Sequence, residues 1–148
     1  MFHIITDSCA DLPKEYIEDN NIRVVPLTVM IDGEEYLDGV DIEPMEFYSK
    51  MAAAKALPKT AQPSPAAFAK VYEGFMDPDD EILVLTISAK LSGTFQSATI
   101  AQGMIDRKVT VFDTLAASLG EGRQVMLAAE MAKKGYPVRQ AVKELTKI

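Results

Sequence analysis

Four apolar runs along the chain predict the strands of a β-sheet. These runs are Phe2 to Ile5, Arg23 to Ile31, Glu81 to Ile87 and Val109 to Asp113. The second run is rich in β-branched residues and is interrupted by Pro26, whereas the third is almost continuously apolar. Nearly continuous apolar strands are typical of a parallel sheet that is covered on both faces.

Helical patterns separate the apolar runs. Apolar residues recur at helical spacing in segments 12–20, 44–54, 65–75, 93–105, 115–134 and 138–148. Asp11 and Pro13 are typical of the start of a helix, and Asp32-Gly33 is a hairpin-turn signal. Strands that alternate with helices predict an α/β fold. We expect one domain over residues 1–148, with a central, mainly parallel sheet and helices on both faces.

The charge of the chain restricts its partners. The formal net charge is −7, and 12 of the 22 acidic residues fall within the first 50 positions, against three basic ones. Such a surface repels nucleic acid and gives no polybasic attraction to a membrane. No apolar run approaches the ~20 residues that span a bilayer, and the N-terminus lacks the basic start of a signal peptide. We expect a cytoplasmic protein without a nucleic-acid partner or stable membrane insertion.

The residues that could support metal or nucleophilic chemistry are few. One cysteine, Cys9, excludes a disulfide framework and a Cys-rich zinc site. The sequence lacks HExxH, an EF-hand loop, a phosphate-binding loop and a GxGxxG after the first strand, so we predict no metal and no cofactor. His3, the only histidine, lies well before the end of the first strand and is expected to be structural. Without a basic neighbour in the sequence, Cys9 is expected to be a partly buried, inert thiol.

A hydroxyl-rich turn follows the third predicted strand and opens a helix. It reads Ser92-Gly93-Thr94. Glycine allows close approach of a ligand to the main chain, and the free N–H groups of a helix start favour an anion. The alternative is that Ser92 only caps the helix. The pattern is therefore compatible with an anion site and with a plain helix cap.

Two further turns carry polar side chains. The segment from Leu57 to Pro65 is expected to be a stiff loop, because Pro63 and Pro65 fix its main chain. It either presents the Thr60 hydroxyl to a ligand or merely connects two helices, with Ser64 as the cap of the second. Asp7-Ser8, after the first strand, is either a functional carboxylate with its hydroxyl or an Asx turn.

Several short motifs resemble the DegV family of bacterial fatty acid-binding proteins. They are Ile5 to Ser8, Val25 to Leu27, Glu46 to Tyr48, Pro58 to Ser64, Leu91 to Ala98 and Phe112 to Thr114. They occur in the order and spacing of that family and cover nearly the whole chain. The resemblance is to the N-terminal domain, so the C-terminal ligand-covering domain of the family is expected to lie outside this sequence.

The resemblance implies a non-catalytic protein that binds one long-chain fatty acid. The threonine and the serine that contact the carboxylate in the family correspond to Thr60 and Ser92, and Ser8, Gln62, Gly93 and Thr94 are candidates for a wider pocket. Some members present the fatty acid to a fatty acid kinase. The alternative is a serine-dependent acyl hydrolase or transferase, with Ser92 or Ser8 as its nucleophile.

One position departs from the family motif. The residue after Thr60 is usually serine in the family, whereas this chain has Ala61. The missing hydroxyl could remove a hydrogen bond worth about 0.5–1.5 kcal/mol. A long acyl chain would still provide most of the affinity, at about 0.8 kcal/mol per buried CH₂ group.

Overall fold

A parallel sheet of four strands forms the centre of the larger part of the molecule. The computed structural model describes residues 2–148. In spatial order the strands are β2 (Arg23–Val25), β1 (Phe2–Asp7), β6 (Glu81–Thr86) and β7 (Val109–Asp113). All neighbouring strands run parallel. Their carboxyl ends therefore lie along one edge of the sheet, where ligands of open α/β sheets bind.

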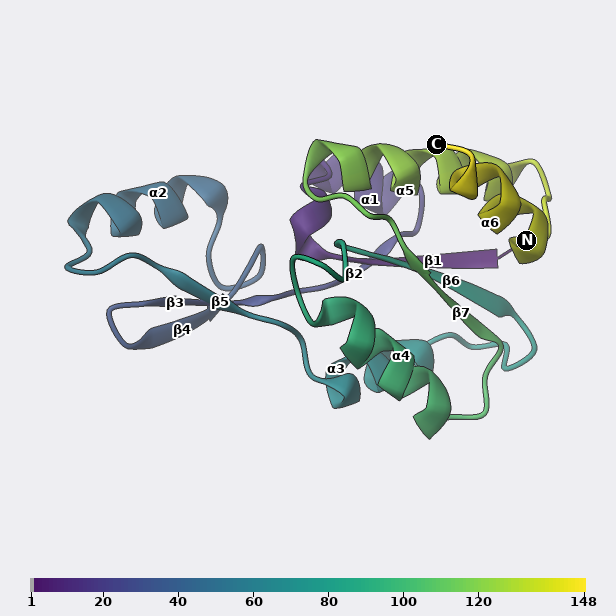
Figure 1. The fold of residues 1–148 in the computed structure, drawn as a ribbon, viewed down its shortest axis with the longest axis horizontal. Coiled ribbons are helices and arrows are strands. Elements are labelled where there is room, and N and C mark those ends of the chain that lie inside the picture. Colours follow the sequence, from purple (N-terminus) through teal and green to yellow (C-terminus); the bar gives the residue numbers. More distant parts are fainter. Residues whose placement is uncertain (1) are drawn as a thin grey trace.

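Helices cover both faces of this sheet. Figure 1 shows α1 (Lys14–Asp19), α5 (Leu119–Lys133) and α6 (Val138–Thr146) on one face, and α3 (Pro65–Tyr72) and α4 (Thr94–Met104) on the other. On the first face Leu83 and Leu85 pack with Val125. On the second face Val84 packs with Phe68 and Tyr72. Strand β6 is thus apolar on both sides, which explains its nearly continuous apolar run.

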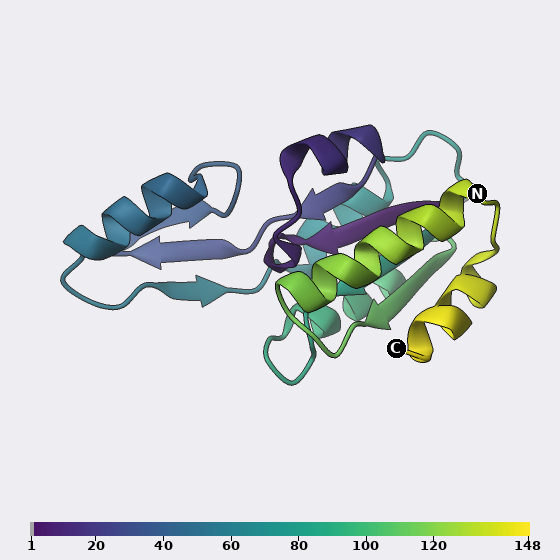
Figure 2. The ribbon, with the colours of Figure 1, turned by 90° about the horizontal axis from the view of Figure 1, so that it is seen from above.

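A second, smaller sheet lies outside the parallel sheet. Its strands are antiparallel, in the order β4 (Glu34–Leu37), β3 (Thr28–Ile31) and β5 (Lys59–Ala61). Helix α2 (Pro44–Ala53) lies against this sheet, and Val29, Ile31 and Ile42 form a small core with Phe47. Residues 28–61 are called the smaller lobe here and the rest the larger lobe. Figures 1 and 2 show that the smaller lobe projects from the larger one.

The turn of the β3–β4 hairpin has the predicted chemistry. Asp32 and Gly33 both have positive φ, of 49° and 83°. Two positive φ angles are characteristic of the type I′ turn, whose twist matches that of the flanking strands. The hairpin predicted from Asp32-Gly33 is confirmed.

The structure corrects the predicted second strand. Residues 23–31 form not one strand but two, β2 and β3, which belong to different sheets. Pro26 lies between them and has no N–H group to donate to a neighbouring strand. The backbone hydrogen bonding of β2 therefore ends at Val25, and the chain leaves the parallel sheet there.

Two predicted helices begin later than expected. Helix α1 begins at Lys14, because the turn Ser8–Ala10 forms a short 3₁₀ helix (η1) and Asp11 has φ 51°, in the left-handed region. Asp11 therefore ends η1 and does not cap α1. Helix α5 begins at Leu119, because Leu115 and Ser118 have positive φ and interrupt the helical geometry before it.

Tyr72 provides a test of the packing between α3 and α4. Its ring is fully buried, and its hydroxyl donates a hydrogen bond to the carbonyl of Ala98 across 2.9 Å. We predict that Tyr72→Phe lowers the free energy of unfolding by about 1 kcal/mol, since one buried hydrogen bond is lost. Tyr48→Phe is the control, because Tyr48 is 59% exposed. Equal urea midpoints for the two variants would mean that the hydrogen bond of Tyr72 does not stabilise the fold.

Candidate functional site

An open pocket lies at the carboxyl edge of the parallel sheet, between the two lobes. Its volume is about 610 Å³, which is within the usual range of ligand sites. The residues that line it are Cys9, Leu27, Asp38, Thr60, Ala61, Gln62, Ile87, Leu91, Ser92 and Gly93. Four of the six predicted site residues are therefore together, although they come from segments about 30 residues apart.

Thr60 reaches the pocket on a strand rather than on a turn. Residues Lys59–Ala61 form β5, in which Thr60 is paired with Val29 of β3. The expectation of a loop over the whole segment 57–65 is wrong, because β3 supplies hydrogen-bonding partners for the backbone of Lys59–Ala61. The remainder leads into α3, and Ser64 caps that helix by accepting a hydrogen bond from the N–H of Ala67.

Gln62, which directly follows the smaller lobe, lies against Gly93 at the pocket. A Cβ atom at position 93 would lie 2.4 Å from Oε1 of Gln62, closer than any real contact. The φ of Gly93 is −79°, which any residue can adopt. The Gln62 side chain therefore packs closely over Gly93, and a larger residue at position 93 would require the end of that side chain to shift.

Ser92 and Thr94 form one polar unit at the start of α4. Their hydroxyl groups are hydrogen-bonded across 2.9 Å, and Ser92 Oγ also accepts from the N–H of Thr94. Thr94 is fully buried and does not line the pocket, so it orients Ser92 from behind. The first turn of α4 holds no acidic residue. The free N–H groups of a helix start and the dipole of the helix favour an anion beside Ser92.

Ser8 does not line the pocket but hydrogen-bonds to residues that do. Its hydroxyl accepts a hydrogen bond from the N–H of Leu27 and lies within hydrogen-bond reach of Asp38. Asp38 lines both this pocket and a neighbouring one of about 480 Å³ beside α1. Burial raises the pKa of Asp38, while the hydrogen bond with Ser8 lowers it. This carboxyl is the one acidic group among the residues that line the pocket.

Asp7 forms an Asx turn, and Cys9 is the partly buried thiol that was expected. Asp7 Oδ1 accepts from the N–H of Cys9 across 2.9 Å, so the structure contains the Asx turn that was one of the two alternatives for Asp7-Ser8. Cys9 is half-buried, and burial, together with the negative charge of Asp7, raises the pKa of its thiol to about 12. The thiol therefore stays protonated and unreactive at neutral pH.

His3 is far from the candidate hydroxyls. It lies near the amino end of β1, where its ring stacks on Phe75 and its Nε2 is 2.8 Å from Asp80. A larger cavity, of about 710 Å³, opens beside it at this opposite end of the strands. The only histidine of the sequence thus serves the structure, as predicted, and does not reach Ser92.

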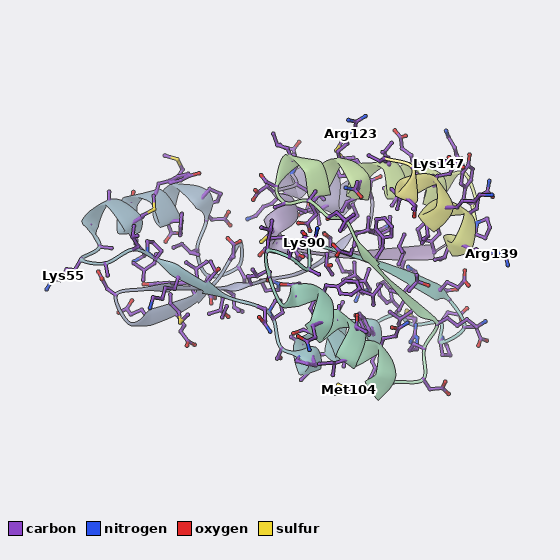
Figure 3. The ribbon with its side chains drawn as sticks, in the orientation of Figure 1. Lys55, Lys90, Met104, Arg123, Arg139 and Lys147 are labelled. Atoms are coloured by element: carbon purple, nitrogen blue, oxygen red, sulfur yellow. The ribbon has the colours of Figure 1, made fainter. Side chains whose placement is uncertain are left out.

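The described part of the chain, residues 2–148, contains no cluster of three or more side chains suited to hold a metal ion. In the same residues no helix has both the length and the apolar character to cross a bilayer. Figure 3 places Lys90 on the loop between β6 and α4, on the side where the lobes meet, whereas Lys55 and Arg139 lie at the two ends of the molecule.

The fold is an α/β domain with an open pocket at the carboxyl edge of its parallel sheet. The family model described as "Uncharacterised protein, DegV family" matches residues 1–148. The chain belongs to the DegV family. The resemblance inferred from the short motifs is thereby confirmed.

Relatives and solved structures agree with this assignment. A DegV domain-containing protein of Caldanaerobacter subterraneus is 43% identical over 140 residues, which are 94% of this chain and 50% of that protein. A fatty acid-binding DegV family protein from Thermus thermophilus is similar in structure, with a TM-score of 0.90 and 42% identity over 99% of this chain and 52% of the other.

A third similar structure belongs to a protein named after a fatty acid kinase. It is the Fatty Acid Kinase (Fak) B3 protein of Streptococcus pneumoniae loaded with linoleic acid, with a TM-score of 0.82 and 25% identity over 99% of this chain and 53% of the other. The present chain spans about half the length of the relatives that it matches.

The contact between Gln62 and Gly93 can be tested by a double-mutant cycle. We predict that Gly93→Ala lowers the free energy of unfolding by about 1 kcal/mol more in the wild-type background than in Gln62→Ala, since residues in contact are coupled. The lower preference for alanine as a helix N-cap affects both backgrounds equally. Chemical denaturation of the four proteins measures the coupling, and additive effects would mean that Gln62 does not rest on Gly93.

Proposed function

We propose that this chain binds a long-chain fatty acid without catalysing a reaction on it. The hydroxyls of Thr60 and Ser92 and the first N–H groups of α4 hold the carboxylate. The observation that carries this proposal is the meeting of Thr60, Gln62, Ser92 and Gly93 in one pocket at a helix N-terminus. Membership of the DegV family and the fatty acid-binding relatives support the ligand class.

The pocket suits a carboxylate that has no cation as its partner. Hydroxyl and main-chain N–H groups donate hydrogen bonds to the ligand, and they are worth more when the donors are already oriented. Thr94 holds Ser92 in place, and β5 holds Thr60. These polar groups set the orientation of the ligand, while the acyl chain supplies most of the affinity.

The apolar part of the pocket provides the start of a path for the acyl chain. Leu27, Ile87 and Leu91 line it beside the hydroxyls. Leu91 is 67% exposed, so an acyl chain laid against it would cover apolar surface that now faces water. Ala61 also lines the pocket, and its methyl group extends the apolar surface at the position where the family usually has serine.

Lipid binding can be measured on this chain directly. We predict that the purified protein carries a fatty acid detectable by mass spectrometry or binds added oleate, and that Ser92→Ala and Thr60→Val each weaken binding about 2- to 10-fold. This range corresponds to the loss of one hydrogen bond of 0.5–1.5 kcal/mol. Ser49→Ala, in the exposed surface of α2, is the matched control.

The fatty acid-binding relative from Thermus thermophilus is the positive control of the assay. Absence of lipid and of oleate binding from this chain, while that protein binds, would refute the proposal. Equal affinity of all three variants would refute the roles of Thr60 and Ser92 but not lipid binding itself.

We further propose that the bound fatty acid is presented to a fatty acid kinase. The name of the similar Streptococcus pneumoniae protein supports this partner. We predict ATP-dependent formation of an acyl phosphate when the loaded chain is mixed with a fatty acid kinase, and none when oleate is supplied without the chain. The product is trapped with hydroxylamine and measured by mass spectrometry. Equal rates with and without the chain would contradict the carrier role.

A further inference from the structure

Two carboxyl side chains lie buried together beneath the pocket. Asp7, at the end of β1, and Glu121, in the first turn of α5, both have zero solvent exposure. Glu121 Oε2 accepts a hydrogen bond from the hydroxyl of Thr6 across 3.0 Å. Its other oxygen, Oε1, is buried and receives no hydrogen bond from any donor in residues 2–148. The Asp7 carboxyl lies within hydrogen-bond reach of Glu121.

The surroundings of the pair offer no positive charge. Within the described residues, neither carboxyl forms an ion pair with a lysine, arginine or histidine. The titratable groups that face the pair are Asp11, whose negative charge disfavours ionisation of Glu121, and Cys9, whose thiol is protonated and neutral. Two ionised carboxylates side by side in such a place would repel each other strongly and lose their hydration. One shared proton removes the repulsion and leaves a single buried charge, which the N–H groups of Cys9 and Ile87 can stabilise.

Asp7 is the member of the pair that accepts hydrogen bonds from the main chain. Its Oδ2 accepts from the N–H of Ile87 across 2.7 Å, and its Oδ1 accepts from the N–H of Cys9 across 2.9 Å. Both Ile87 and Cys9 line the pocket. An ionised Asp7 makes these bonds stronger, which leaves the proton to Glu121.

We propose that Glu121 is a positioning residue that carries one buried proton and donates it in a hydrogen bond to Asp7, which in turn holds the main chain of Cys9 and Ile87 against the pocket. We assign this proton to Oε1, the Glu121 oxygen that receives no hydrogen bond from the described residues. The hydrogen bond between Glu121 and Asp7 links α5 to the carboxyl ends of β1 and β6, and the shared proton limits the charge of this pair to a single negative unit.

The pKa values of the two groups agree with this geometry. Burial, and next the hydrogen bond and charge of Asp7, raise the pKa of Glu121 from its ordinary 4.5 to about 10. Burial also raises the pKa of Asp7. Between pH 4.5 and 10 the folded chain therefore holds one proton more than the unfolded chain. Stability from this source is greatest at low pH and is lost as the pH rises toward 10.

The proton is tested first on the ligand-free chain, with Glu121→Gln. Glutamine keeps a donor for Asp7 and an acceptor for Thr6 but carries no titrating proton. Urea unfolding is measured from pH 6 to pH 9. The unfolding equilibrium constant of the wild type, divided by that of Glu121→Gln, is expected to increase about tenfold per pH unit, as one linked proton requires. A ratio that does not change with pH would overturn the proposal.

Glu130→Gln is the matched control, because Glu130 is an exposed residue of the same helix. Its ratio to the wild type is expected to stay constant over this pH range. A second measurement needs no variant: in wild-type protein labelled with ¹³C in glutamate side chains, one carboxyl resonance keeps its protonated position at pH 8. If every glutamate carboxyl is ionised at pH 8, the proposal is wrong.

The positioning role is tested by hydrogen exchange at the amides of Cys9 and Ile87. Glu121→Ala is expected to speed their exchange at least tenfold relative to the wild type, and Glu121→Gln to restore the protection. Exchange that is equally fast in both variants, or unchanged in both, would overturn the role of Glu121 as the residue that holds Asp7.

The effect on ligand affinity rests on the proposed function. Ionisation of Glu121 adds a second negative charge beneath a site for an anion, so oleate affinity is expected to fall more steeply between pH 8 and pH 10 in the wild type than in Glu121→Gln. If oleate affinity falls equally with pH in the wild type and in Glu121→Gln, the proton on Glu121 does not influence ligand binding. Failure of lipid binding at every pH would refute the proposed function and leave the proton measurements as they stand.

Discussion

The chain crosses between its two sheets at two places, and the rest of the arrangement depends on these crossings. It leaves the parallel sheet at Pro26, between β2 and β3, and returns through Gln62 and Pro63, between β5 and α3. Proline interrupts strand pairing because it has no N–H group. Since both crossings lie at the carboxyl edge of the parallel sheet, the hydroxyl of Thr60 is carried back beside Ser92 and the start of α4.

The pocket combines groups that would each be ordinary in isolation. A serine before a helix, a glycine beside it and a threonine on an edge strand are common local features of proteins. What distinguishes them here is their support: Thr94 orients Ser92, Gly93 leaves room for Gln62, and Asp7 holds the main chain on which Cys9 and Ile87 lie. In the proposed function these donors are oriented before the ligand arrives, which would lower the entropy lost on binding.

The sequence predicted the element types and the parallel sheet well, because apolar periodicity reports burial directly. It located Thr60 and Ser92 through a family resemblance rather than through their local patterns, which fit a connector and a cap equally well. It missed β5, since three mostly polar residues carry no strand periodicity. It also missed the pairing of Asp7 with Glu121, because a contact between distant segments leaves no mark on either segment alone.

The placement of the two hydroxyls has a mechanical consequence. Thr60 belongs to the smaller lobe and Ser92 to the larger one, and two chain crossings connect the lobes. Rotation of one lobe about these crossings changes the distance between the hydroxyls. A ligand group that hydrogen-bonds to both hydroxyls would connect the two lobes beside these crossings. Rotation that separates the lobes would then have to break the hydrogen bonds to the ligand. Release of the ligand and rotation of the lobes would therefore be coupled.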